Sequence, residues 1–217
     1  MTVTLFLDTS ADVRVGVAVG DRPAGRAALA DRRAHAEQLM PLIGVALADA
    51  GLTLADVDRL VVGVGPGPFT GLRVGVVTAT TLGLALRRPV KGVCSLDAVA
   101  RQWAGAGAPE RFVVVSDARR REVYWAAYGP GGVREDGPFV TTPAHVPALP
   151  LAGPGASLVG AEVTGPVDLD PAAVAAGVDE LPDAGLEPLY LRRPDAALPS
   201  APKSTIPQPR LAMGRPR

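Results

Sequence analysis

Apolar residues in the first half of the chain follow two patterns: short runs rich in valine and leucine, and longer stretches with a helical period. The short runs predict five strands, at residues 3–7, 13–19, 24–30, 60–64 and 90–93. A helical period begins near His35, where Pro41 predicts a kink or a delayed regular start, and another covers residues 72–86. Ser95 is expected to cap a third helix that reaches Trp103.

A similar plan begins again after a joint rich in glycine and alanine at residues 105–109. A strand at 112–115 leads to Asp117 and is followed by a hairpin partner at 123–128, as the first strand leads to Asp8. Two α/β halves of this kind suggest the actin/hexokinase-like (ASKHA) architecture, with two RNase H-like subdomains. In that fold such hairpins hold ATP phosphates across a cleft between the domains.

The expected domain division follows from the joint. We expect an N-terminal subdomain at residues 1–104 and a smaller C-terminal subdomain at 105–193, with short helices near 143–149 and 171–176. The Pro-rich tail at 194–217 is expected to be disordered.

The loop Gly65-Pro66-Gly67-Pro68-Phe69-Thr70-Gly71-Leu72-Arg73 joins a strand to a helix through an unusual backbone path. Such a turn suits either a bound anion or a tightly packed partner. The Walker A pattern requires a lysine after its last glycine, where Leu72 stands, and a dinucleotide fingerprint fails at Pro68 or Thr70. On chemistry alone, a rigid strand–helix corner is favoured over a phosphate site.

The helix after this loop has a small residue at every fourth position, namely Gly71, Gly75, Ala79 and Gly83. These residues form one row, which another helix could approach closely. The same row would also suit packing on the protein's own sheet, so both alternatives stay open. Val74, Val77 and Leu84 lie on the opposite side and are expected to face that sheet.

Composition narrows the class of protein. The chain has 217 residues, of which 47% are hydrophobic and only 4% aromatic, and its single cysteine, Cys94, excludes an internal disulfide. The apolar span between Arg73 and Arg87 is shorter than the ~20 residues that cross a bilayer. We therefore expect a cytoplasmic protein without a membrane segment. The net charge is zero, so a role with nucleic acid is expected to act through a partner.

Several motifs occur in an order that resembles the bacterial TsaB family, also called YeaZ. They are Leu5-Phe6-Leu7-Asp8-Thr9-Ser10, the glycine loop at residues 65–73, Ser95-Leu96-x-Ala98, Asp117-Ala118-Arg119 and Pro188-x-Tyr190-Leu191-Arg192. The likeness covers roughly residues 3–193. One departure is Pro68, where the family usually has serine.

The resemblance implies a non-catalytic relative of the enzyme TsaD. With the ATPase TsaE, that pair attaches threonylcarbamoyl to adenosine 37 of tRNA. TsaB pairs with TsaD through helices of its N-terminal domain, which match the two helices described above. The implied partner-binding residues are Leu39, Ile43, Ala46, Gly71, Gly75, Ala79 and Gly83. The resemblance also implies homodimers in isolation and no cofactor of its own, while leaving open whether ATP binds at the interface with TsaD.

The residues themselves argue against catalysis. The active relative holds a metal through a His-x-x-x-His pair, but Leu39 follows His35 at that spacing. Candidates for a remnant of the nucleotide cleft are Asp8, Thr9, Ser10, Asp117 and Arg119. Active members use Asp-x-Gly in these hairpins, and Ser10 and Arg119 occupy the glycine positions.

Two alternative functions and one question about a surface segment stay open. One is an ATP-dependent small-molecule kinase of the same fold that uses Asp8 and Asp117. Another is a glycoprotease-like peptidase, although the sequence has no Gly-x-Ser-x-Gly elbow. Finally, Arg119-Arg120-Arg121 is either a contact with tRNA phosphate or a solvated hairpin edge.

Overall fold

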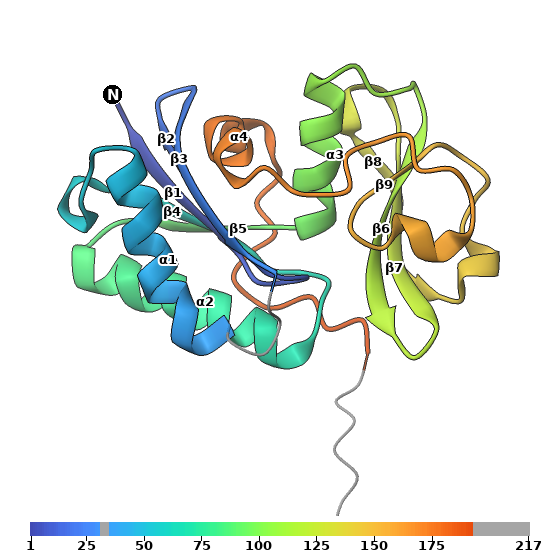
Figure 1. Cartoon of the computed structure of the whole chain (residues 1–217), viewed down its shortest axis with the longest axis horizontal. Helices are drawn as coiled ribbons and strands as arrows, with labels where there is room; N and C mark the ends of the chain where they lie inside the picture. The colour runs from blue at the N-terminus through green and yellow to red at the C-terminus, as the bar shows by residue number, and fades with distance from the viewer. Residues whose placement is uncertain (31–34, 193–217) are drawn as a thin grey trace, which may run out of the picture.

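The computed structural model describes residues 1–30 and 35–192, so the tail predicted at 194–217 lies outside the described residues. Its first sheet has five strands: β1 (Val3–Asp8), β2 (Val13–Val19), β3 (Arg22–Leu29), β4 (Arg59–Gly63) and β5 (Val90–Val93). Their order is β3-β2-β1-β4-β5 (Figure 1). The first three strands are antiparallel, whereas β4 and β5 run parallel to β1. All five predicted strands are confirmed.

The second sheet repeats this plan on a smaller scale. It comprises β6 (Phe112–Arg119), β7 (Glu122–Tyr128), β8 (Arg134–Thr141) and β9 (Leu151–Ala152), in the order β8-β7-β6-β9. In each sheet the opening hairpin is followed by a third antiparallel strand, and a parallel strand pairs with the opening strand. The duplicated ASKHA-like fold predicted from the sequence is therefore confirmed.

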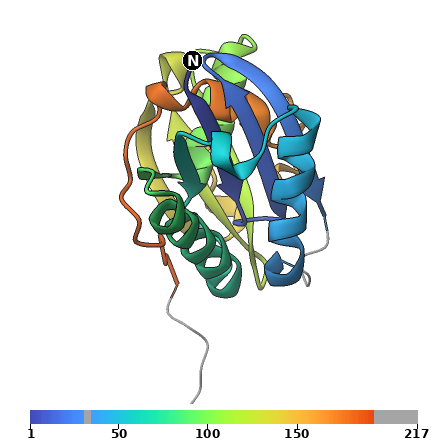
Figure 2. The same cartoon turned by 90° about the vertical axis from the view of Figure 1, so that its left-hand side faces the viewer.

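Four α-helices cover these sheets. Helices α1 (His35–Asp49) and α2 (Phe69–Leu86) lie side by side on the outer face of the first sheet (Figure 2). Helices α3 (Ser95–Gly105) and α4 (Pro171–Ala176) lie between the two sheets (Figure 1). One buried cluster joins α1 and α2 to the first sheet, and another joins both sheets through α3 and α4.

Three predictions about individual helices differ from the structure in detail. Helix α1 is continuous through Pro41. Ser95 is the first residue of α3 and not its cap, since Cys94 holds that position and Ser95 Oγ accepts a hydrogen bond from the Gly65 N–H (3.2 Å). The helix predicted at 143–149 is wrong, because only a 3-10 turn forms, at Pro143–His145.

The last described part of the chain returns to the first sheet. Helix α4 packs on β1, β2 and β3, where a side chain at Gly16 would collide with the Pro171 carbonyl. We call residues 184–192 the C-terminal strap. Its Ala184 N–H donates to Gly92 O, and its Leu189 N–H donates to Val64 O, both at 2.8 Å. Helix α4 and the strap, which fall within the range 105–193 predicted for the second subdomain, therefore contact the first sheet.

Candidate functional site

The turn after β1 holds a buried carboxylate. Asp8 Oδ1 accepts hydrogen bonds from the backbone N–H (2.8 Å) and the hydroxyl (2.6 Å) of Ser10. The second oxygen, Oδ2, lies near the Ser95 hydroxyl but makes no hydrogen bond of good geometry within the described residues. Burial raises the pKa of Asp8, and the Ser10 hydrogen bonds oppose this only in part.

Replacing Asp8 with asparagine is expected to stabilise the protein at neutral pH by about 1–2 kcal/mol, because it removes a buried charge and leaves the Ser10 bonds in place. Because folding raises the pKa of Asp8, ionisation of this carboxyl lowers the free energy of unfolding, and the loss is complete once the pH has risen through the folded-state pKa. The gain should therefore shrink near pH 4. Urea unfolding at pH 7.5 and pH 4 measures both effects.

Asp117→Asn serves as the matched control, because Asp117 is partly exposed and paired with Arg119. This variant should not stabilise the protein. An Asp8→Asn variant that is less stable than the wild type at pH 7.5 would contradict the expectation and would indicate that the carboxylate has a partner.

The glycine loop and α2 cover the Asp8 turn directly. The Thr9 hydroxyl donates to the Gly71 carbonyl (2.7 Å), and a side chain at Gly75 would collide with Thr9 Oγ1. A Cβ at Gly67 would lie 2.6 Å from the Ser10 carbonyl oxygen. The loop is thus the rigid strand–helix corner that the sequence favoured. The glycine loop and α2 lie against Ser10 and Thr9, and only a small space is left beside Asp8 and Ser10.

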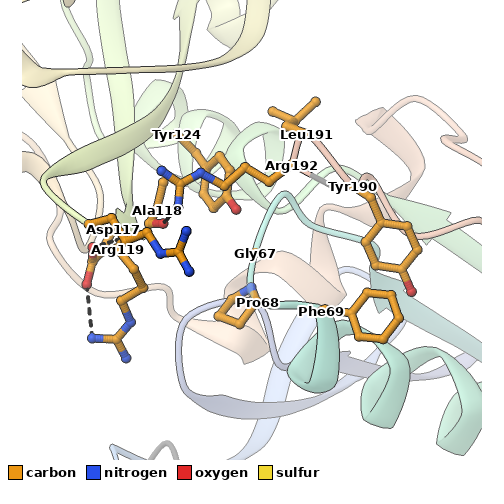
Figure 3. A pocket seen from close by; sticks show the side chains of 11 residues that line it. Gly67, Pro68, Phe69, Asp117, Ala118, Arg119, Tyr124, Tyr190, Leu191 and Arg192 are labelled. Atoms are coloured by element: carbon orange, nitrogen blue, oxygen red, sulfur yellow. Dashed lines mark hydrogen bonds and ion pairs between the residues drawn. The ribbon is translucent and has the colours of Figure 1, made fainter. Parts of the chain in front are cut away.

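The second hairpin turn lies beside a different cavity. Asp117 Oδ1 accepts the Arg119 N–H (2.7 Å), and the two side chains form an ion pair at 3.3 Å. Beside them is a cavity of about 190 Å³ between the glycine loop, this turn and the end of the strap (Figure 3). Its lining comprises Gly67, Pro68, Phe69, Asp117, Ala118, Arg119, Arg120, Tyr124, Tyr190, Leu191 and Arg192.

The structure does not bring the predicted cleft residues together. Asp8 and Ser10 line a separate space of only about 30 Å³, room for about one water molecule, whereas Asp117 and Arg119 line the larger cavity. Thr9 points into α2. Among residues 1–30 and 35–192, no group of three His, Cys, Asp or Glu side chains could hold a metal ion. The remnant cleft predicted from Asp8, Thr9, Ser10, Asp117 and Arg119 is thus divided into two parts.

The predicted partner-binding residues face the protein's own core, which corrects their assignment. Seven small or aliphatic positions on α1 and α2 are buried in the single chain: Leu39, Ile43, Ala46, Gly71, Gly75, Ala79 and Gly83. On α2 the reason is the sheet beneath it, since Gly75 contacts Thr9 and Gly83 contacts Val90. The row of small residues lets the helix approach its own sheet.

Of the three residues predicted to face the sheet from the opposite side of α2, Val74 is partly buried against the core, whereas Val77 and Leu84 are exposed, contrary to the prediction. Val77 is 60% and Leu84 is 82% exposed. On the neighbouring α1, Met40 is 44% and Val45 is 56% exposed. We call these four side chains the docking face. Among the described helices, α2 alone has a length and composition that also suit a membrane span, because it is apolar on both its buried and its exposed side.

Nucleophiles are poorly placed in the part of the chain that the structure describes. Burial raises the pKa of the Cys94 thiol to about 12, so little thiolate is present at neutral pH. His145 Nδ1 lies 2.9 Å from Thr142 Oγ1 on an exposed turn. Neither arrangement resembles an activated nucleophile with its base.

Comparisons with known proteins agree with this fold. The family model described as TsaD, tRNA N6-adenosine threonylcarbamoyltransferase, matches residues 29–153, which is more than half of the chain. An uncharacterized protein of Mycobacterium tuberculosis (strain ATCC 25618 / H37Rv) is 51% identical over 179 residues, covering 79% of this chain and 82% of that protein.

Two further relatives carry informative names. The tRNA threonylcarbamoyladenosine biosynthesis protein TsaB of Escherichia coli (strain K12) is 39% identical over 97 residues, which cover 44% of this chain and 42% of that protein. Among solved structures, YeaZ from Pseudomonas aeruginosa matches with a TM-score of 0.71 and 28% identity, over 88% of this chain and 100% of that one.

Proposed function

The chain belongs to the TsaB (YeaZ) family and carries a TsaD-like domain, and we propose that it acts in the synthesis of threonylcarbamoyladenosine in tRNA. Its role is that of a non-catalytic subunit, which docks and activates the catalytic subunit TsaD together with the ATPase TsaE. This role places the protein in the cytoplasm.

The covered hairpin turn supports a non-catalytic role. An enzyme of this architecture needs both aspartate turns open to the same nucleotide. Here the loop at Gly67 and the helix at Gly75 lie directly on the Asp8 turn. The Asp117 turn lines a separate cavity. No observation favours the kinase or the peptidase alternative over this proposal.

The docking face is the observation that carries the proposal. Leu84 and Val77 leave large apolar areas in water on a helix whose opposite side is buried against its sheet. Exposed apolar side chains gathered on neighbouring elements are typical of protein–protein contacts. The surface lies on the two helices that the family resemblance assigns to TsaD, but it uses their outward side. In the absence of TsaD, the same face is proposed to pair two copies of this chain.

The test is the double variant Val77→Glu/Leu84→Glu. Two charges at the centre of an apolar contact should weaken TsaD binding by about 100-fold or more. The free subunit should keep its stability within about 0.5 kcal/mol, because both side chains are exposed. Isothermal titration with purified TsaD measures the first effect, and thermal unfolding measures the second.

The matched control is Val133→Glu/Val167→Glu, which adds the same charges at exposed apolar positions outside α1 and α2 and outside the cavities beside Arg119–Arg121. It should bind TsaD like the wild type. Equal affinity of the Val77→Glu/Leu84→Glu variant and the wild type would refute the docking face. In a strain depleted of the native subunit, threonylcarbamoyladenosine in tRNA should be restored by the control variant and not by the docking-face variant.

A further inference from the structure

The turn between β6 and β7 has three consecutive arginines with a left-handed backbone. The φ angles of Arg119, Arg120 and Arg121 are 64°, 54° and 63°. Arg119 pairs with Glu122 across the hairpin, so Arg120 and Arg121 are the two central residues of a two-residue loop. A loop with positive φ at both central positions strongly prefers Asn-Gly or Asp-Gly, because arginine is strained there. We call Arg119–Arg121 the arginine turn.

A strained turn that keeps arginine at each position suggests a role beyond closing the hairpin. All three residues are exposed. Residues of the turn line two cavities, one of about 190 Å³ and one of about 480 Å³. Together their linings contain four arginines, the arginine turn and Arg192, against two carboxylates, Asp117 and Glu122. This part of the surface therefore carries excess positive charge although the chain as a whole is neutral.

Aromatic side chains lie at the other end of the smaller cavity. Phe69 and Tyr190 pack against each other with ring centroids 4.9 Å apart (Figure 3). The Arg73 guanidinium lies 3.9 Å from the centre of the Phe69 ring, and its Nε donates to the Tyr190 hydroxyl (3.2 Å). Guanidinium groups beside aromatic rings are a frequent feature of surfaces that bind RNA strands.

The strap fixes this arrangement. Arg192 Nη1 donates to the Ala118 carbonyl (3.0 Å), and its guanidinium forms an ion pair with Glu122. Tyr190 is held against Phe69 by the same segment. Phe69 begins α2 and Tyr190 lies in the strap, whereas the arginine turn joins two strands of the second sheet. The strap therefore contacts both the aromatic pair and the strand that leads into the arginine turn.

Size and lining together bear on the kind of ligand. The larger cavity, at about 480 Å³, falls within the ~300–1,000 Å³ of sites that enclose a small molecule, but five of its eight lining residues are charged, whereas such sites are mostly apolar. The smaller cavity, at about 190 Å³, falls below that range. It is large enough to receive part of a longer ligand whose remainder lies outside. Arginine forks match phosphate oxygens in geometry and charge.

We propose that the arginine turn and the adjacent cavity bind the phosphate backbone of an RNA strand. The arginines contact successive phosphates, and the aromatic pair at Phe69 and Tyr190 provides a surface against which a sugar or a base packs. The identification of this RNA as tRNA rests on the proposed function. The contact itself belongs to this chain, so the isolated subunit retains it without TsaD.

The experiment measures binding of an unmodified tRNA transcript to the full-length chain by fluorescence anisotropy. The salt concentration is varied from about 25 to about 200 mM, a range over which affinity that depends on phosphate contacts falls steeply. Arg120→Asn should weaken binding by about tenfold at low salt and reduce the slope of log K against log salt by about 1. Its Tm should rise by about 2–4 °C, because asparagine tolerates a positive φ. A gain in stability with a loss of binding cannot come from misfolding.

Arg87→Asn is the matched control. Arg87 is also an exposed arginine with positive φ, 55°, but it ends α2 and lies outside both cavities. It should show the same gain in Tm with unchanged tRNA binding. Equal weakening by both variants would indicate general attraction between charges and would overturn the proposal, as would wild-type binding that does not depend on Arg120.

Two further measurements complete the test. The first distinguishes an RNA strand from a free nucleotide as the source of the bound phosphate, and the second distinguishes RNA binding from TsaD docking. Millimolar ATP should not displace the transcript. Displacement that is abolished by Arg120→Asn would assign the site to a free nucleotide and overturn the RNA proposal. TsaD affinity of the Arg120→Asn variant should equal that of the wild type. Failure of the docking-face test would thus refute the proposed function while leaving RNA binding by the isolated chain intact.

Discussion

Replacing Gly75 with leucine is expected to destabilise the free subunit by about 4 kcal/mol, which corresponds to a fall in Tm of about 8–16 °C. Helix α2 lies so close to the turn after β1 that a Cβ at this position would collide with Thr9 Oγ1. The larger side chain would push the helix away from the sheet and break the hydrogen bond from Thr9 to Gly71. Thermal unfolding of the purified subunit measures the effect.

Gly44→Leu is the matched control, because Gly44 is also inside a helix but a Cβ there would meet no atom within 4 Å. This substitution should stabilise the subunit by about 0.5–1 kcal/mol through helix propensity. A double-mutant cycle locates the collision. Thr9→Ala removes the colliding atom, so Gly75→Ala should cost about 1 kcal/mol less in that background. A Gly75→Leu variant as stable as the wild type would show that the row of small residues does not pack against the protein's own sheet.

This prediction concerns the two sides of α2, which the sequence analysis assigned the wrong way round. A row of glycines and alanine at every fourth position indicates that a backbone approaches closely, but it does not say which backbone. The opposite row, with Val74, Val77 and Leu84, was expected to face the sheet because it is apolar. In the structure the helix uses its smallest side for the sheet, since Thr9 and Val90 fill the space above the strands. The larger apolar side is then left exposed.

The duplicated plan, by contrast, could be predicted because its signals are local. Each opening strand is a run of buried, mostly apolar residues that leads to an aspartate, Asp8 in β1 and Asp117 in β6. Strand β8 escaped prediction because its residues are half-buried or exposed and show no alternation. Strand β9 has only two residues, Leu151 and Ala152, so it is defined by its pairing with β6.

The candidate site was predicted only in part, for a similar reason. The sequence marks Asp8, Ser10 and the glycine loop as unusual, but it does not show that Gly67 lies against Ser10 and closes the turn. The positive φ angles of the arginine turn could have been suspected from its position between two predicted strands. No sequence pattern placed Tyr190 beside Phe69, because the two residues are far apart along the chain and meet only through the strap.

The strap itself supports the second large prediction. Gly92→Ala is expected to lower stability by about 3 kcal/mol and Tm by about 6–12 °C, because a Cβ at Gly92 would collide with the carbonyl oxygen of Gly185. The colliding atoms are a Cβ fixed to the backbone of β5 and a backbone oxygen of the strap. Because neither atom can rotate away, the strap must move away from β5. The hydrogen bond from Ala184 to Gly92 and that from Leu189 to Val64 should then be lost. Hydrogen exchange at the Ala184 and Leu189 amides measures this release.

Gly105→Ala is the control, because a Cβ at Gly105 would have no neighbour within 4 Å. Release of the strap should also separate Tyr190 and Arg192 from the arginine turn, while the docking face on α1 and α2 keeps its place. Gly92→Ala should therefore weaken tRNA binding as Arg120→Asn does and leave TsaD affinity unchanged. A loss of both activities would indicate that the strap supports the whole first sheet. A loss of neither, with the Leu189 amide still protected, would show that the strap tolerates the added methyl group.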